Sequence, residues 1–415
     1  MTIYNFMTIL NINKYYFIKG GAERFFFELG KLFEKHGHKV VSFSTRHKNN
    51  FKTPYEKYFV SEVVTDKISF GWSGMRTVAR FFWSCSARRK IKQLIAVEKP
   101  NLAIIHNIYH QISPSILPVL KKHNIPLVLI AHDYALLSPN YNMFVRNKVY
   151  DKICGSGWLK CLADRCVKNS FIISLICGLE TFFHHAVLNI YKKNIDLIIC
   201  PSKFMYTKFV QADWTEEKLM QIPYFISQKR LNTKALKHSN KKYILYFGRL
   251  SIEKGVDVLI DAMRNLPDIK LKIVGSGPEK MNYELRIMNY GLKNIEILDY
   301  KSDQELNEII AQAKFIVAPS LWYENYPLSV LEAYALGVPA LVADSGGLPE
   351  MIPARDKKFI FSPGDSRELT RKIKFLWENE DSVNQMGEKV KQFIEKNNES
   401  ERYYSQLMAL GKKIK

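Results

Sequence analysis

Short apolar runs alternate with longer amphipathic segments along most of the chain, a pattern typical of strands alternating with helices. In the N-terminal half, the apolar runs predict strands at residues 8–12, 39–43, 102–105, 127–131 and 197–200. In the C-terminal half, they predict strands at residues 243–247, 292–298, 315–318, 338–342 and 359–361. Runs this apolar indicate parallel strands that helices cover on both faces. The pattern therefore predicts an α/β protein built from two such repeats.

The length of 415 residues exceeds what one ordinary core supports, so two domains are expected. We expect an N-terminal domain over residues 1–220 with an insert at 138–195, followed by a polar linker at 221–241. A C-terminal domain is expected over residues 242–395. The last residues, 396–415, are expected to form a helix that packs back on the N-terminal domain.

Charge changes this picture, because 61 Lys and Arg face 40 Asp and Glu and give a net charge of +21. Such a surplus of positive charge favours an acidic partner. The candidates are nucleic acid, an anionic membrane face and a phosphate-bearing small molecule. Aromatic residues mix with Arg and Lys over residues 68–98, which favours a basic amphipathic helix on an anionic membrane. The alternative is a domain helix with its aromatic face in the core. No recognisable nucleic-acid module accompanies the charge, so no nucleic-acid partner is expected.

The chain contains no apolar run of the roughly 20 residues that span a bilayer. Its first residues lack the apolar core of a signal peptide, and either Met1 or Met7 is the start. Six cysteines without such a signal indicate a reducing, cytoplasmic compartment. The spacing of Cys154, Cys161 and Cys166 in the insert matches no ordinary zinc site, so free or buried thiols are expected there.

Polar side chains follow the ends of predicted strands in the N-terminal half. His106, Asn107 and Tyr109 follow one strand, and His132 follows the next. Ligands of open α/β sheets bind at this edge, where an imidazole can donate to a substrate, move a proton or simply cap the strand. Gly20 and Gly21, after the first strand, either let backbone N–H groups approach a phosphate or merely permit the turn.

The C-terminal half places a second group of polar residues at strand ends. Gly248 and Arg249 follow residues 243–247, and Lys254 lies five residues on, so the two cations could clamp a pyrophosphate. Glu324 and Glu332 flank the start of a predicted helix. Two carboxylates suit a hydroxyl-rich ligand, although a solvated loop and helix pair is the open alternative.

Seven motifs in order resemble those of retaining glycosyltransferases of family 4, which have the GT-B fold. They are G-G-A-E-R at 20–24, H-D-Y at 132–134, G-R-L at 248–250, E-K-G at 253–255, V-G-S-G-P at 274–278, E-x7-E at 324–332 and G-G-L-P-E at 346–350. Residues 106–117 are similar to the subset that builds bacterial capsules, O-antigens and exopolysaccharides. The resemblance implies two Rossmann-like domains that face each other across a cleft.

The resemblance also implies a role for each matching residue. Arg249 and Lys254 would neutralise the departing nucleotide diphosphate, so neither a metal nor another cofactor is expected. Glu324 would bind the donor sugar, and Glu332 would bind the ribose. Further donor contacts would come from backbone near Gly248, Gly275, Leu328 and Ser329, and from Gly20 and Gly21 of the other domain. His132 would lie near the reacting carbon, and His106, Asn107 and Tyr109 would lie on the acceptor side.

The function so implied is transfer of a hexose from a UDP- or GDP-sugar to a membrane-held, polyprenyl-diphosphate-linked glycan in bacterial surface polysaccharide synthesis. The enzyme would be peripheral on the inner face of the cytoplasmic membrane. Two alternatives stay open, a sugar-nucleotide epimerase on the same fold and a non-catalytic polyanion-binding protein. The sequence departs from similar enzymes at Ser138, where a Cys is common, and at Gly157, where a Cys-x-x-Cys would end.

Overall fold

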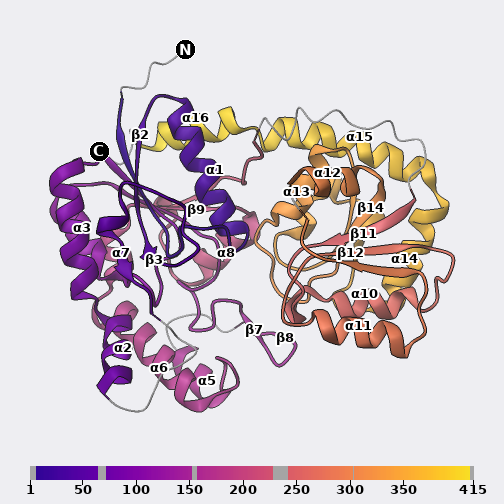
Figure 1. Cartoon of the computed structure of the whole chain (residues 1–415), viewed down its shortest axis with the longest axis horizontal. Helices are drawn as coiled ribbons and strands as arrows, with labels where there is room; N and C mark the ends of the chain where they lie inside the picture. The colour runs from indigo at the N-terminus through magenta and orange to yellow at the C-terminus, as the bar shows by residue number, and fades with distance from the viewer. Residues whose placement is uncertain (1–5, 64–71, 152–156, 228–241, 302, 412–415) are drawn as a thin grey trace. The chain divides into compact units, whose positions relative to one another are not determined.

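The computed structural model describes residues 6–63, 72–151, 157–227, 242–301 and 303–411, drawn in colour in Figure 1. Contacts divide the chain into two compact units. Unit 1 holds residues 1–145, 151–222 and 403–415, and unit 2 holds residues 146–150 and 223–402. Met1, Cys154, the first residues of the 68–98 segment and most of the expected linker, at 228–241, lie outside the described residues.

Unit 1 is built on a parallel six-stranded sheet with the strand order β10-β9-β6-β5-β1-β2. Its strands are β1 (Thr8–Ile12), β2 (Lys39–Phe43), β5 (Leu102–Ile105), β6 (Leu127–Ile130), β9 (Leu197–Cys200) and β10 (Leu219–Gln221). The four inner strands are buried along their whole length, as the apolar runs predicted. Helices connect them, among them α1 (Gly21–Lys35), α3 (Cys85–Glu98), α4 (Leu117–Lys122), α7 (Ile190–Asn194) and α8 (Lys203–Gln211).

The end of the chain also contributes to unit 1. From Tyr403 onward, helix α16 (Ser400–Gly411) packs beside α1, where the ring of Tyr403 meets Phe25 edge to face at 5.6 Å. The ring of Tyr404 stacks on His36 at 3.6 Å, and its hydroxyl lies 2.7 Å from Nε2 of His38. Both tyrosines are buried, so this segment completes the core around α1.

The insert of unit 1 forms a small helical group. It contains α5 (Gly157–Ala163) and α6 (Phe171–Phe182), and it continues through a π-helical turn at Phe183–Val187. A short hairpin, β7 (Phe144–Val145) and β8 (Lys148–Val149), precedes these helices. Helices α5 and α2 (Trp72–Phe82) both pack against α6 (Figure 1).

Unit 2 repeats the architecture with a second parallel sheet of strand order β13-β12-β11-β14-β15-β16. The strands are β11 (Tyr243–Phe247), β12 (Leu271–Val274), β13 (Ile295–Leu298), β14 (Ala313–Ala318), β15 (Ala340–Ala343) and β16 (Ile360–Phe361). The helices are α10 (Val256–Met263), α11 (Lys280–Asn289), α12 (Asp303–Ala311), α13 (Leu328–Ala335), α14 (Ser366–Glu378) and α15 (Glu380–Asn397). The prediction of an α/β protein with two parallel sheets is confirmed.

Glycines allow the strand ends of unit 2 to approach one another closely. Gly248 and Gly275 follow the adjacent strands β11 and β12, and both have positive φ angles, of 151° and 153°. A Cβ atom on Gly275 would overlap the carbonyl oxygen of Gly248. The positive φ angle favours glycine at both positions, and at Gly275 the space excludes a side chain as well.

The prediction of one basic helix over residues 68–98 is wrong in the described part of that segment. Helix α2 ends at Phe82, and Ser84 starts α3 by accepting a hydrogen bond from Ala87 N at 3.2 Å. This cap favours a new helix start, because a serine hydroxyl satisfies an otherwise unpaired backbone N–H group. Three of the basic side chains donate to backbone carbonyls, Arg80 to Ser61, Arg88 to Ser115 and Lys90 to Phe59.

The expectation of free thiols in the insert is wrong for Cys161 and Cys166, which form a disulfide. Cys161 lies in α5, and the backbone N–H of Cys166 donates to its carbonyl at 3.0 Å just past the helix end. This turn brings the two Cα atoms to 4.9 Å, within the range of disulfides. Cys85, Cys177 and Cys200 are free.

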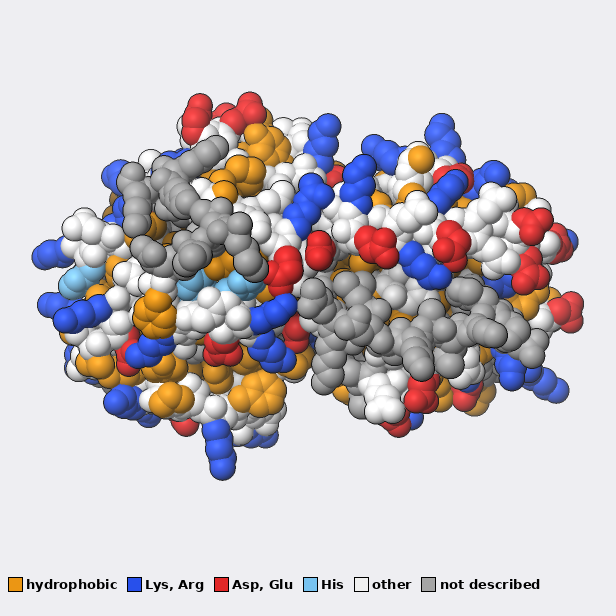
Figure 2. Space-filling view, turned by 90° about the horizontal axis from the view of Figure 1, so that it is seen from above, with side chains coloured by type: hydrophobic (Ala, Val, Ile, Leu, Met, Phe, Trp, Pro, Cys, Tyr) orange, Lys and Arg blue, Asp and Glu red, His pale blue; other side chains and the backbone are white. Residues whose placement is uncertain are grey.

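Two further observations concern the surface. Among the described helices, none is long and apolar enough to cross a bilayer. On the face drawn in Figure 2, Lys and Arg side chains are scattered among Asp, Glu and uncharged residues. That face therefore does not present the continuous basic field that a polyanion-binding protein would use.

We expect Gly275→Ala to lower the free energy of unfolding by roughly 2–4 kcal/mol, because the methyl group meets the Gly248 carbonyl and the φ angle is strained. Gly291→Ala is the matched control, since its φ of 63° is also positive but its Cβ would meet no atom within 4 Å. That variant should lose only roughly 1–2 kcal/mol. Urea denaturation measures both, and equal losses would contradict the close approach.

Candidate active site

The candidate site of unit 2 lies at the carboxyl edge of its sheet, where β11 and β14 run side by side. Gly248 and Arg249 follow β11, Lys254 ends the short helix that precedes α10, and Glu324 lies in the loop after β14. A small pocket collects them. Its lining includes five residues predicted from the sequence, Gly248, Arg249, Lys254, Glu324 and Ser329. Parallel strands end at one edge of a sheet, so residues distant in sequence meet there.

Lys254 and Glu324 form an ion pair across this pocket. The Nζ atom of Lys254 lies 2.6 Å from Oε1 of Glu324, and Ser320 Oγ donates to the same oxygen at 2.7 Å. The Glu324 side chain is 8% exposed and that of Lys254 is 23% exposed. The ammonium also lies over the ring of Trp322, at 4.9 Å from its centroid. The contacts hold both side chains in one arrangement.

The environment keeps Glu324 ionised. Burial raises the pKa of this carboxyl, but the charge of Lys254 and the hydrogen bonds from Lys254 and Ser320 outweigh burial, so the pKa falls below its ordinary value of 4.5. The pocket therefore holds a carboxylate that can accept hydrogen bonds from hydroxyl groups, and a cation that can approach a phosphate.

The loop after β15 fixes the backbone of Glu324. Gly347 N donates to the carbonyl of Glu324 at 2.7 Å, and Glu324 and Gly346 form an isolated parallel bridge. Gly346 has a φ of 64°, and a Cβ atom there would overlap the Glu324 backbone. The loop at 345–347 thus holds the backbone of Glu324, and this close approach requires glycine at position 346.

The remaining predicted donor residues of unit 2 lie around this pair. Arg249 is exposed, and its guanidinium makes no hydrogen bond or ion pair with the described residues. Leu328 and Ser329 form the first turn of α13, and Glu332 is buried in its second turn. Gly275 packs closely against the backbone carbonyl of Gly248. The first-turn N–H groups of a helix are suited to an anion, which agrees with the implied donor contacts.

A separate group of predicted residues lies at the carboxyl edge of the unit 1 sheet. His106 follows β5 and His132 follows β6, and their rings stack with Nδ1 of His106 at 2.7 Å from Nε2 of His132. On its other side, Nε2 of His106 lies 2.9 Å from Oδ1 of Asn11 in β1. The Asn11 amide nitrogen donates to Phe26 O at 3.2 Å, which assigns Oδ1 as the acceptor. His106 therefore donates to Asn11, and His132 donates to His106.

Both imidazoles are neutral at physiological pH. Burial lowers the pKa of His106 well below 6.5, and the neighbouring His132 lowers it further. Burial and the charge of Lys14 lower the pKa of His132 to about 3. A neutral His132 whose Nε2 carries the proton keeps Nδ1 as an acceptor nitrogen, so it can orient a hydroxyl group but brings no positive charge.

The other residues predicted in unit 1 differ in burial and in what their backbone requires. Asn107 is buried, and its backbone pairs with Asn13 and Lys14 in the loop after β1. Tyr109 is half-buried in the loop that follows. Gly20 and Gly21 are exposed at the start of α1. Gly20 has extended backbone, and a Cβ atom there would make only ordinary contacts, so neither its conformation nor its space demands glycine.

The sequence analysis assigned no individual role to Asn11 of unit 1 or to Ser320 and Gly346 of unit 2. Asn11 stands inside an otherwise apolar buried strand, and a polar residue in such a run indicates a specific hydrogen bond. Ser320 follows β14 just after Pro319, where a hydroxyl group at a strand end was available as a signal. Gly346 belonged to a noted glycine loop, but its partner Glu324 could not be inferred.

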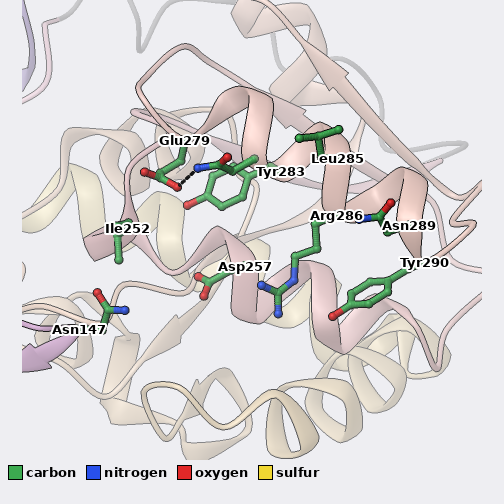
Figure 3. A pocket seen from close by; sticks show the side chains of 10 residues that line it. Asn147, Ile252, Asp257, Glu279, Tyr283, Leu285, Arg286, Asn289 and Tyr290 are labelled. Carbon is green, nitrogen blue, oxygen red and sulfur yellow. Dashed lines mark hydrogen bonds between the residues drawn. The ribbon is translucent and has the colours of Figure 1, made fainter.

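A larger hollow of unit 2 lies between α10 and α11 (Figure 3) and has a volume of about 420 Å³, against about 50 Å³ for the Lys254 pocket. Arg286 extends across it toward Asp257 and forms a forked ion pair with Asp261, with bonds of 3.1 and 2.6 Å. None of the predicted site residues lines this hollow. Size alone therefore does not mark the candidate site.

Comparison with known proteins places the chain in a family. Residues 19–230, about half of the chain, match the model of Glycosyltransferase Family 4, and residues 227–393 match that of Glycosyl transferases group 1. The chain belongs to glycosyltransferase family 4. The resemblance read from the sequence motifs is thereby confirmed.

Individual relatives are more distant. The chain is 25% identical over 241 residues to sulfoquinovosyl transferase SQD2 of Arabidopsis thaliana, covering 55% of this chain and 45% of the relative. It is 24% identical over 199 residues to the amylovoran biosynthesis glycosyltransferase AmsK of Erwinia amylovora, covering 45% of this chain and 49% of the relative. The chain thus spans about half the length of these curated relatives.

Among solved structures, HepE of Anabaena in complex with UDP and glucose aligns over 97% of this chain and 99% of that chain, with a TM-score of 0.62. The sequence identity is 18%, so this likeness shows the fold alone. It confirms the prediction of the GT-B fold class.

We expect Lys254→Met to lower the free energy of unfolding at neutral pH by roughly 2–3 kcal/mol, because Glu324 then stays buried without its counter-charge. In the unchanged protein, the lowered pKa of Glu324 contributes stability above pH 4.5, and this is lost as pH falls through the folded value. The difference between the two proteins should therefore shrink below pH 4.5. Urea titrations across pH measure it, and Glu324→Gln should restore part of the loss.

The pKa of His132 is lowered from 6.5 to about 3 in the folded protein. Its neutral form therefore contributes stability in full above pH 6.5, and this contribution is lost as pH falls from 6.5 toward 3. We expect the loss of unfolding free energy between pH 7 and pH 5 to be about 2 kcal/mol smaller in His132→Gln. His123→Gln, at an exposed imidazole after α4, is the control and should leave the loss unchanged. An unaltered loss in His132→Gln would contradict the neutral histidine pair.

Proposed function

We propose that the protein is a retaining glycosyltransferase that moves a hexose from a nucleotide-diphosphate sugar to a glycan acceptor. The observation that carries the proposal is the Lys254–Glu324 pair beside an exposed Arg249, at adjacent strand ends of a family 4 chain. Two cations next to a buried carboxylate suit a ligand that joins a diphosphate to a hydroxyl-rich ring. HepE, of the same fold, is described in complex with UDP-glucose, which favours UDP over GDP as the nucleotide.

Each residue then has a part in donor binding. Arg249 and Lys254 neutralise the diphosphate, Glu324 accepts from hydroxyl groups of the sugar, and Glu332 accepts from those of the ribose. The first-turn amides at Leu328 and Ser329, and the backbone at Gly248 and Gly275, complete this contact. Because the pocket is small while Lys254 and Glu324 are paired, entry of the donor redirects the Lys254 ammonium toward phosphate.

In unit 1, we propose that the backbone of Gly20 and Gly21 at the start of α1 contacts a phosphate of the donor. His132 would bind a hydroxyl group of the donor sugar near the reacting carbon. His106, Asn107 and Tyr109 lie on the acceptor side. The bond between the anomeric carbon and the phosphate oxygen breaks, the acceptor oxygen bonds to the same face, and its proton passes to the leaving phosphate. With Arg249 and Lys254 supplying the positive charge, the reaction needs no metal ion, so a chelator should leave its rate unchanged.

The acceptor class follows from the relatives and the charge. AmsK is named for amylovoran biosynthesis, which favours a surface polysaccharide as the product of this chain as well. A polyprenyl-diphosphate-linked glycan at the inner face of the cytoplasmic membrane is the acceptor we propose. The net charge of +21 suits work at an anionic lipid surface.

Nucleotide release from UDP- and GDP-sugars, with and without a lipid-linked acceptor extract, tests the function. We expect Lys254→Ala and Glu324→Gln each to lower kcat/KM by roughly 100-fold or more, because the charge at the diphosphate or the sugar contact is lost. Glu253→Gln is the matched control, since Glu253 is next to Lys254 but its carboxylate accepts a hydrogen bond from Ser251 rather than from Lys254. Release from donor alone with an altered sugar would instead indicate an epimerase, and no release from any donor would refute the proposal.

A further inference from the structure

Helix α6 has its polar face turned inward and its apolar face turned outward. The buried side is made of Ser174, Cys177, Gly178 and Glu180. The exposed side carries large apolar residues, namely Phe171 at 52%, Ile172 at 57%, Leu179 at 41% and Phe182 at 38% exposure. At 100° per residue these four fall within an arc of about 100°. A helix that only covers a domain core has the opposite arrangement.

Contacts on the inward side determine this orientation. Glu180 places Oε2 at 3.0 Å from Nδ1 of His110 and Oε1 at 3.7 Å from Nδ1 of His184. His184 in turn places Nε2 at 2.8 Å from the carbonyl of Phe82 at the end of α2. Rotating α6 to bury its phenylalanines would expose this network and place a carboxylate away from its partners, so the apolar face stays outward.

The exposed apolar area extends beyond α6. Leu159 of α5 and Val187 of the π-helical turn, each 56% exposed, add to Phe171, Ile172, Leu179 and Phe182. We refer to these six residues as the α5–α6 apolar surface. Helix α5 packs directly against α6 (Figure 1), so the six belong to one small helical group. Large exposed apolar residues gathered on one small helical group mark interaction sites more often than isolated ones do.

Positive charge accompanies this surface. Lys160 of α5 and Arg165 and Lys168 in the turn before α6 are exposed, whereas Asp164 is half-buried and Glu180 is buried. The described part of the insert from Leu159 to Val187 therefore presents three exposed cations and no fully exposed carboxylate. Cations next to an apolar helical face are the pattern of helices that lie in the interface of an anionic bilayer.

We propose that the α5–α6 apolar surface inserts into the interfacial layer of an anionic lipid bilayer, with Lys160, Arg165 and Lys168 at the headgroups. A second copy of the chain is a poorer occupant, because each copy carries a net charge of +21 and would bring the same cations together. The described part of the 68–98 segment is a poorer anchor than α6, because Arg80, Arg88 and Lys90 donate hydrogen bonds to backbone carbonyls. The proposal deepens the proposed function by naming the surface that meets the membrane of a lipid-linked acceptor.

Flotation of the full chain with vesicles tests this surface, with phosphatidylcholine alone compared with equal parts of phosphatidylcholine and phosphatidylglycerol. We expect flotation with the anionic vesicles only. Phe171→Ser combined with Ile172→Ser should weaken the partition by roughly tenfold or more, because two exposed side chains no longer enter the apolar layer. Arg165→Ala combined with Lys168→Ala should weaken it by a similar factor, and added salt should reduce binding of the unchanged protein.

Met281→Ser combined with Met288→Ser is the matched control, since these α11 residues are 71% and 67% exposed but lie in unit 2. It should float like the unchanged protein. The proposal is overturned if the unchanged protein fails to float or if the α6 variants float equally well. It is also overturned if size-exclusion chromatography with light scattering shows a dimer of the unchanged protein that the α6 variants convert to a monomer. A thermal shift with UDP separates the two proposals: a shift retained by the α6 variants shows that the donor site is intact, and no shift in any form refutes the proposed function alone.

Discussion

The ion pair between Lys254 and Glu324 is the interaction on which the candidate site depends. It joins two strand ends that are 70 residues apart in sequence, in a pocket where either charge alone would be unstable. The pair keeps the carboxylate ionised despite its burial, and the exposed Arg249 beside it leaves a second cation for an anionic ligand. The pair therefore balances the two charges within the pocket.

Close backbone packing makes this pair possible. Gly275 lets the end of β12 press against Gly248, and Gly346 lets the loop after β15 meet the backbone of Glu324. In unit 1, an analogous edge holds two imidazoles rather than an ion pair, and Asn11 sets the direction of their hydrogen bonds. The edge in unit 2 thus presents fixed charges, whereas the edge in unit 1 presents neutral hydrogen-bonding groups.

Most of the strands could be predicted from the sequence, because buried parallel strands appear as uninterrupted apolar runs and end where polar residues begin. The same signal located Glu324, Lys254, His106 and His132 at strand ends. It could not show that Lys254 contacts Glu324, or that Asn11 orients His106, because these contacts cross between strands that are distant in sequence. The bond between Cys161 and Cys166 depends on a local turn that spacing alone did not reveal. Helix α6 shows a different limit: its apolar pattern is plain, but periodicity does not say which face is turned inward.

The contribution of α16 to unit 1 has a consequence for how the chain is made. Tyr403 and Tyr404 fill the core beside Phe25, His36 and His38, yet they are translated after all of the unit 2 sheet. Unit 1 therefore cannot complete its core until unit 2 has been synthesised, which departs from the usual order in which an N-terminal domain folds first. Until α16 emerges, the rings of Phe25 and His36 lack their partners in this helix, so the nascent chain exposes this aromatic face for as long as unit 2 is being synthesised.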